Sequence, residues 1–246
     1  MRFRLSGILR RRQVLPAVMA FALAFFGVMP SATAGLGACG VVQSIFVRST
    51  LMQASSLGST NKILVKNRTV DPDCKGQAVS TSQAGTPMGD PTPTYVEIGW
   101  YKVRHADGSV HLCEFEEAVV NGGSPNFLPG PCDSNTPLSY GQYAEFRVKH
   151  VGSGTDWDTW INYGSGFILK ASFSSLGIDT GIAFGETEKK GDGTSMGEDQ
   201  SNLQDFSQNA WQDWPNAACA LDNAAAWDWN KLSSNSYIVD QTTHAC

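Results

Sequence analysis

Between residues 95 and 188 the chain alternates apolar and polar residues in a series of short runs, as half-buried β-strands do. Clusters of Gly, Pro, Asn and Asp separate the runs, and HADGS (105–109) has the Asp-Gly pair of a hairpin turn. Two earlier stretches, 41–50 and 61–67, are apolar enough to add one or two strands. The pattern predicts an all-β fold: a single antiparallel β-sandwich domain with long loops. The runs cover residues 95–103, 109–117, 143–151, 158–173 and 181–188.

Three segments lack this alternation. Residues 71–94 are rich in Pro, Gly, Ser and Thr, and residues 121–137 (NGGSPNFLPGPCDSNTP) contain several prolines and glycines. We expect both to be long loops. Residues 219–229 (CALDNAAAWDW) are expected to form a short helical turn, and no amphipathic helix is expected before residue 200.

The first thirty-four residues have the three parts of an export signal. MRFRLSGILRRR is basic, VLPAVMAFALAFFGVM is apolar, and SATA ends in small residues. We expect cleavage near Ala34 and a secreted, extracellular protein. The apolar run is short for a membrane span. RRRQVL also fits a twin-arginine signal loosely, so the export route stays open.

The charge of the chain limits its partners. The net charge is −5, and the expected signal peptide contains five arginines and no acid, so the mature chain is more acidic still. An acidic surface argues against a nucleic-acid partner and against general binding to anionic membranes.

All six cysteines follow the expected cleavage site. An even count in an exported chain favours three disulfides, and fifteen connectivities are open. The simplest joins neighbours in the sequence: Cys39 with Cys74, Cys113 with Cys132, and Cys219 with Cys246. The alternative for Cys39 is lipidation, because LGAC resembles a lipoprotein cleavage box; the mature protein would then be held at a membrane.

Carboxylates are the candidate chemistry. The four histidines lack metal-site spacing, no G-x-S-x-G elbow is present, and the cysteines are expected in disulfides. We therefore expect no metal and no cofactor. Glu97 alternates away from the apolar side of its strand and sits between Tyr95 and Tyr101, while Glu186 shares a strand face with Phe184.

An acid beside apolar and aromatic side chains is poorly solvated, which raises its pKa towards the working pH. Two such carboxylates within reach of one water can divide the work of acid and base. The ordinary alternative is that Glu97 and Glu186 are solvated strand residues.

Four blocks, in order along the chain, resemble the neprosin family of secreted glutamic peptidases. VEIGWYKV (96–103) is similar to the family's E-x-G-W-x-V strand, and IAFGETE (182–188) to the segment that ends in G-G-E. Between them, residues 158–177 resemble a segment in which tryptophans precede Y-G-x-G; TSMG (194–197) resembles the run that follows. The chain departs from the family at Phe184-Gly185-Glu186, which has one glycine fewer.

The resemblance implies an antiparallel β-sandwich in which Glu97 and Glu186 are the catalytic pair, a polypeptide is the substrate and the pH is acidic. We expect Tyr95 and Tyr101 to flank the cleft, and Trp160 and Tyr163 to be further substrate-binding candidates. Gln142 and Asn162 are candidate donors to the oxyanion. The expected organisation is a signal peptide at 1–34, N-terminal strands and a Pro/Gly/Ser-rich loop at 35–90, and a neprosin-like core with a C-terminal extension at 91–246.

Two alternatives remain open at this point. The same sandwich could be a non-catalytic secreted module that binds peptide or glycan through its aromatic residues, or, less directly, a glycosidase that uses paired acids. Trp160 lies in the long run 158–173, where an aromatic residue is more often part of the core than of a binding platform.

Overall fold

The structure, a computed structural model, describes residues 45–50, 56–70, 77–85, 94–105, 107–124, 126–190, 198–215, 218–221 and 228–240. For 45–50, 77–85, 182–190, 198, 218–221, 228–230 and 239–240 the description is limited to the backbone. The expected signal peptide and its cleavage site lie outside the described residues.

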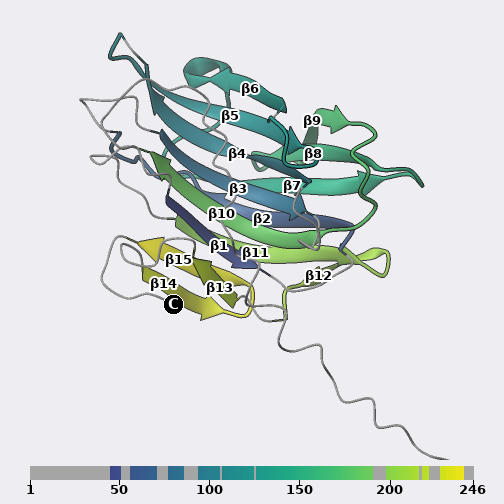
Figure 1. The fold of residues 1–246 in the computed structure, drawn as a ribbon. Helices are drawn as coiled ribbons and strands as arrows, with labels where there is room; N and C mark the ends of the chain where they lie inside the picture. Colours follow the sequence, from purple (N-terminus) through teal and green to yellow (C-terminus); the bar gives the residue numbers. More distant parts are fainter. Residues whose placement is uncertain are drawn as a thin grey trace, which may run out of the picture.

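Two antiparallel sheets pack face to face as a β-sandwich, which confirms the predicted fold class (Figure 1). In spatial order, the seven-stranded sheet consists of β13 (Ala218–Leu221), β1 (Ile45–Thr50), β10 (Ile182–Lys190), β3 (Gln77–Gly85), β4 (Tyr95–Arg104), β5 (Val110–Val119) and β6 (Asn126–Cys132).

The eight-stranded sheet has β12 (Ala210–Asp213) paired to β11 beside its main path. Along that path it consists of β14 (Asp228–Ser233), β15 (Ser236–Asp240), β11 (Glu198–Ser207), β2 (Gly58–Leu64), β7 (Tyr143–Val151), β8 (Asp156–Asn162) and β9 (Phe167–Phe173).

The core lies between the sheets and follows from strand alternation. Ile98 and Trp100 of β4 belong to one buried cluster with Phe146 of β7 and Ile161 of β8, and none of these side chains is exposed to solvent. Successive strand residues point to opposite faces, so the residues that alternate with them lie on the outer faces of the sheets. The apolar pattern read from the sequence is therefore the pattern of the core.

Trp157, and not Trp160, is the core tryptophan of β8. Trp157 is fully buried, and its indole N–H donates to the backbone carbonyl of Ile178 at 3.0 Å. Trp160 has the opposite parity along the strand and is half-buried on the outer face. The expectation that Trp160 packs in the core is wrong. The run 158–173 contains two strands, of which the first begins at residue 156 and the second at residue 167, and the alternation of the first strand buries Trp157 instead.

Two segments expected to be long loops contain strands. β3 lies within 71–94 and pairs with both β10 and β4, in the middle of its sheet. Its sequence, QAVSTSQAG, is small and polar and has no apolar alternation. Strand pairing on both sides, rather than hydrophobic pattern, fixes it as a strand. β13 likewise replaces the first residues of the expected helical turn at 219–229.

β6 lies within the other expected loop, 121–137. It is the last strand of its sheet, where the prolines of NFLPGPC are tolerated because an edge strand leaves one side unpaired. Gly130 fits closely against β5: a Cβ there would lie 2.8 Å from the Cβ of Glu114. A small residue at that position lets the edge strand approach.

The expected hairpin and one expected disulfide are confirmed. β4 and β5 pair without a register shift, and Gly108 in their turn has a φ of 87°, which favours glycine. Cys113 of β5 and Cys132 of β6 form a disulfide with a Cα–Cα distance of 4.1 Å. The other two pairings, and lipidation of Cys39, fall on residues whose side chains lie outside those described.

The expected N-terminal strands are part of both sheets. β1 and β3 belong to the seven-stranded sheet and β2 to the eight-stranded sheet, between β11 and β7. In the described ranges, no helix has the length and hydropathy needed to span a membrane.

Trp157→Ala should lower the free energy of unfolding by about 3–5 kcal/mol, because it removes a large buried ring and orphans the carbonyl of Ile178. Trp160→Ala is the matched control on the same strand and should cost clearly less. Chemical denaturation of both variants checks this expectation; equal losses would contradict the assignment of Trp157 to the core.

Candidate active site

Glu97 lies on the outer face of the seven-stranded sheet. Its neighbours along β4, Val96 and Ile98, are in the core cluster, whereas Tyr95 and Tyr101 have the same parity as Glu97. The side chain is nevertheless only 6% exposed. The sequence-based placement of a glutamate opposite the core and between two tyrosines is therefore correct at the level of the strand.

The pairing register relates Glu186 to Glu97 through β3. Glu97 pairs with Gln83, which pairs with Phe184 on β10. Glu186 is two residues further along β10, and the register of the three strands has no shift. Directly paired residues share a sheet face, so Glu97 and Glu186 occupy positions on one face. Their Cα atoms are separated by about 12 Å, from two strand spacings and an offset of two residues.

Glu117 is a third acid at this place, which the sequence interpretation missed. It pairs directly with Glu97 across β4 and β5, and it accepts a hydrogen bond from the hydroxyl of Tyr95 at 2.5 Å. Directly paired residues have Cβ atoms about 5 Å apart, so like charges at these positions repel. The alternation in CEFEE could have found it, because Glu117 has the opposite parity to Glu114 and Glu116.

Tyr101 belongs to an aromatic cluster beside Glu97. Its ring lies 5.9 Å from those of both Phe115 and Phe127, in edge-on arrangements. Burial raises the pKa of the Tyr101 hydroxyl, so it stays neutral. Phe127 is 39% exposed, and the cluster thus joins the buried surface around Glu97 to solvent.

The structure does not bring Trp160 and Tyr163 to this face. Trp160 is on the outer face of the other sheet, and the hydroxyl of Tyr163 donates to Glu114, inside the sandwich, at 2.6 Å. The two candidate oxyanion donors are elsewhere as well: Asn162 donates to Glu145 at 2.8 Å, and the side-chain oxygen of Gln142 accepts from Ser139 at 2.7 Å.

A second group of acids lies between the sheets. Glu114 is fully buried; it forms an ion pair with Lys170 at 2.6 Å and accepts hydrogen bonds from Tyr163 and Thr136. Glu116 is 4% exposed. Burial, helped by the charge of Glu114 and opposed by Lys170, raises the pKa of Glu116 to about 7. A polypeptide cannot reach these groups, so we assign them a structural role.

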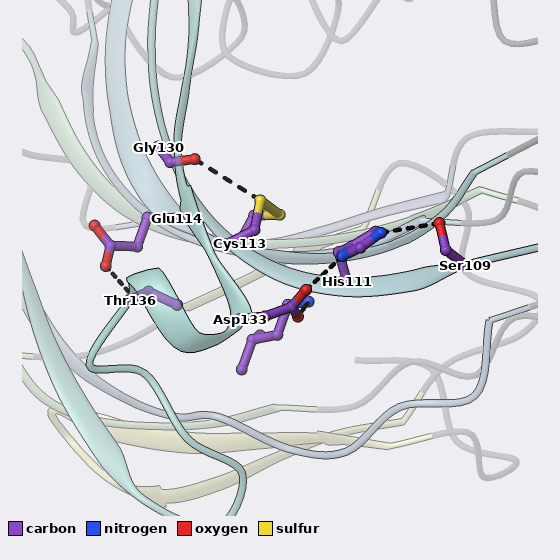
Figure 2. The surroundings of a disulfide bond; sticks show 9 residues. Ser109, His111, Cys113, Glu114, Gly130, Asp133 and Thr136 are labelled. Carbon is purple, nitrogen blue, oxygen red and sulfur yellow. Dashed lines mark hydrogen bonds and ion pairs between the residues drawn. A yellow bond between two sulfur atoms is a disulfide. The ribbon is translucent and has the colours of Figure 1, made fainter.

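Ser109, His111 and Asp133 form a chain of contacts next to the disulfide, as Figure 2 shows. The Nε2 atom of His111 lies 2.9 Å from the Ser109 hydroxyl, and Nδ1 contacts Asp133. The hydrogen bond to His111 lowers the pKa of Asp133. The order resembles a Ser-His-Asp triad.

Ser109 is not set up as a nucleophile, however. Its hydroxyl donates to Asp107 at 2.7 Å, and its backbone N–H donates to the same carboxylate. The backbone N–H groups of His105 and Gly108 are also bonded within the hairpin, so they are not available to an oxyanion. We interpret these contacts as structural: they hold Asp133, directly after β6, against the β4–β5 hairpin.

No group of three or more His, Cys, Asp or Glu side chains in the described part of the chain is arranged to hold a metal ion.

Comparisons with known proteins agree with the resemblance at the level of the fold. No protein-family model matches the sequence, and no curated protein matches it. The structure is similar to scytalido-glutamic peptidase with a transition state analog inhibitor, with a TM-score of 0.56 and 12% identity over 82% of this chain and 100% of that one. It is also similar to SCP-B, a member of the eqolisin family of peptidases in complex with the tripeptide Ala-Ile-His, with a TM-score of 0.53, 10% identity and the same coverage. The chain has the glutamic peptidase fold.

Glu116→Gln should change how stability depends on pH. The folded state raises the pKa of Glu116 from 4.5 to about 7, so it holds a proton that the unfolded chain releases. The stabilisation from this group is complete below about pH 4.5 and is lost as the pH rises to about 7, by about 1–3 kcal/mol. The glutamine variant should lose less stability over this interval. Unfolding curves at pH 4.5 and 7.5 provide the test, and parallel pH profiles for both proteins would contradict it.

Proposed function

We propose that the protein is a secreted glutamic peptidase of the neprosin type, which hydrolyses polypeptides at acidic pH through Glu97 and Glu186. One observation carries the proposal: in a glutamic peptidase fold, the register of β4, β3 and β10 gives these two glutamates positions on the same outer face. The separation of about 12 Å between their Cα atoms is one that two extended glutamate side chains can bridge around a single water.

The reaction needs one carboxylate and one carboxylic acid. The ionised glutamate takes a proton from the water as the water attacks the peptide carbonyl. The protonated glutamate then gives its proton to the nitrogen of the leaving amine as the C–N bond breaks. The starting state returns when the proton that the base accepted from the water passes to the glutamate that gave its proton to the amine, so no cofactor is required.

The surroundings of Glu97 favour the acid role for it. Glu97 is 6% exposed, so its carboxyl group is largely shielded from water. Glu117 lies directly opposite and accepts a hydrogen bond from Tyr95, which favours the ionised form of Glu117. A negative charge there disfavours a second one on Glu97. We therefore assign proton donation to Glu97 and activation of water to Glu186.

The substrate surface would extend over the aromatic side chains on this face. Tyr95 holds Glu117, and Tyr101 with Phe115 and Phe127 forms an apolar wall beside Glu97. Two proteins that share the fold are described in complex with a transition state analog inhibitor and with a tripeptide. Their ligands support a polypeptide as the ligand of this chain.

The proposal includes export with cleavage near Ala34, which the basic and apolar parts of residues 1–34 support. A mature protein without a lipid on Cys39 would be released from the membrane. Intact-mass measurement of the mature protein distinguishes a chain that begins near residue 35 from an acylated chain that begins at Cys39.

Glu97→Gln and Glu186→Gln should each remove most peptidase activity, because each leaves the shared water with one functional partner. The double variant should lose little more than either single variant, since the pair acts as a unit. Activity of the unmodified protein should be highest on the acidic side of neutrality and fall as the shared proton leaves. The measurement is digestion of a denatured protein mixture between about pH 3 and 7, with cleavage products read by mass spectrometry.

Glu117→Gln is the matched control, because it removes a carboxylate from the same face while both proposed catalytic residues remain. It should keep activity. The pH of maximum activity should fall, because the negative charge that disfavours ionisation of Glu97 is removed. If the unmodified protein cleaves nothing, or if folded Glu97 and Glu186 variants remain fully active, the protein is not a glutamic peptidase. The sandwich would then be a secreted module that binds peptide or glycan.

A further inference from the structure

A polar cavity lies on the outer face of the eight-stranded sheet, in the other layer of the sandwich from Glu97. Its volume is about 260 Å³, and it is lined by residues of β2, β7 and β11 and the start of β9. The pairing of Thr60 with Arg147, and of Arg147 with Trp160, makes one row of this face. The pairing of Lys62 with Glu145 makes the next row. None of these residues takes part in the proposed peptidase reaction.

Arg147 is the most unusual lining residue. The centre of its guanidinium lies 3.5 Å from the ring centroid of Phe167 and 4.5 Å from that of Trp211. Within the described part of the chain no carboxylate lies within ion-pair distance of it, and its buried Nε has no hydrogen-bond partner. Burial lowers the pKa of Arg147. Two aromatic rings thus fix a planar cation whose hydrogen-bonding capacity is largely unused.

Apart from Phe167 the rest of the lining is polar, and the whole lining, Arg147 included, has a net charge of +1. Lys62 supplies a second cation. Glu145 is the one lining carboxylate, and it already accepts a hydrogen bond from Asn162 at 2.8 Å. The amide side chains of Asn202 and Gln204 complete the cavity.

A β-bulge brings Asn202 to the cavity. The pairing of β11 with β2 shifts between Ser201 and Gln204, and Asn202 in the shift has a φ of 52°, a left-handed conformation. Bulges of this kind redirect a side chain and are common beside functional sites. Asparagine tolerates this conformation, so the bulge can hold the Asn202 side chain at the cavity independently of Arg147.

We propose that this cavity binds the carboxylate-bearing sugar of an acidic polysaccharide, a hexuronate residue. The arginine fork matches a planar carboxylate with two parallel hydrogen bonds, and Lys62 adds charge. The amides of Asn202 and Gln204 can pair with sugar hydroxyls, while Phe167 offers an apolar wall.

The protein would then have two separate binding surfaces, one on each sheet. The eight-stranded sheet would hold an acidic polysaccharide, and the outer face of the seven-stranded sheet would remain open to polypeptide. The inference does not depend on peptidase activity, because no residue is shared between the two sites.

Calorimetric titration of the purified protein with a galacturonate trisaccharide tests the proposal. The neutral galactose trisaccharide and tri-glutamate are the comparison ligands: the first lacks the carboxylate, and the second carries carboxylates on a peptide. Binding of the galacturonate trisaccharide alone is the expected result. Arg147→Gln and Arg147→Lys should each weaken it about tenfold or more, because both lose the bidentate pair. Glu97→Gln should bind like the unmodified protein.

Lys149→Gln is the matched charge control. Lys149 is on the same face of the same strand, but it lies over the ring of Phe206, at 4.1 Å, and does not line the cavity. Its removal should change affinity by less than about twofold, since Lys149 makes no contact with a ligand in the cavity. Equal losses for Lys149→Gln and Arg147→Gln, equal binding of tri-glutamate, or no binding at all would overturn the proposal. Melting curves establish that each variant is folded. If Arg147→Gln is unfolded, the affinities of Arg147→Lys and Asn202→Ala for the galacturonate trisaccharide are compared with that of the unmodified protein, and equal affinities would overturn the proposal.

Discussion

The uninterrupted antiparallel pairing of β10 with β3, and of β3 with β4, is the constraint on which the candidate active site depends. Strand residues alternate between faces, so a slip of one residue in β4 would bury Glu97 and turn Ile98 and Trp100 outward. The loss of those buried side chains from the core excludes the slip. The packing of the interior therefore determines which acids stand on the outer face.

The same alternation separates two groups of acids on β5. Glu117 belongs to the outer face and faces Glu97, whereas Glu114 and Glu116 lie inside. Inside, Lys170 and the hydroxyls of Thr136 and Tyr163 satisfy Glu114. Glu116, whose pKa is about 7, is neutral in acid. The contribution of Glu116 to stability is therefore largest at acidic pH.

The sequence predicts those parts of the fold whose pattern is local. β4 and β7 were predictable because apolar residues alternate along them, and the β4–β5 turn because Asp107 and Gly108 suit a hairpin. β3 was not predictable: its small polar residues carry no pattern, and its partners β4 and β10 are separated in the sequence by about eighty residues. β6 was hidden by prolines that only an edge strand tolerates.

The residues of the candidate sites divide in the same way, into those with a local sequence pattern and those that depend on another strand. The parity of Glu97 could be read from its own strand, and both the strand pattern and the resemblance pointed to Glu186. Alternation alone could have placed Glu117 on the outer face, but its significance comes from Tyr95 and Glu97 on another strand. The significance of Arg147 likewise comes from Phe167 and Trp211 on other strands. Trp160 and Tyr163 looked equivalent in the sequence, but a turn and opposite parity send them to different places.

The most direct test of the central claim is a crystal structure at acidic pH with a peptide-based transition state analog bound. We expect one carboxyl oxygen of Glu97 and one of Glu186 to lie within hydrogen-bonding distance, about 2.6–3.2 Å, of the analog's tetrahedral centre. The Arg147 cavity should remain without the analog. An analog bound away from the outer face of the seven-stranded sheet, or carboxyl groups of Glu97 and Glu186 too far apart to share one oxygen, would contradict the claim.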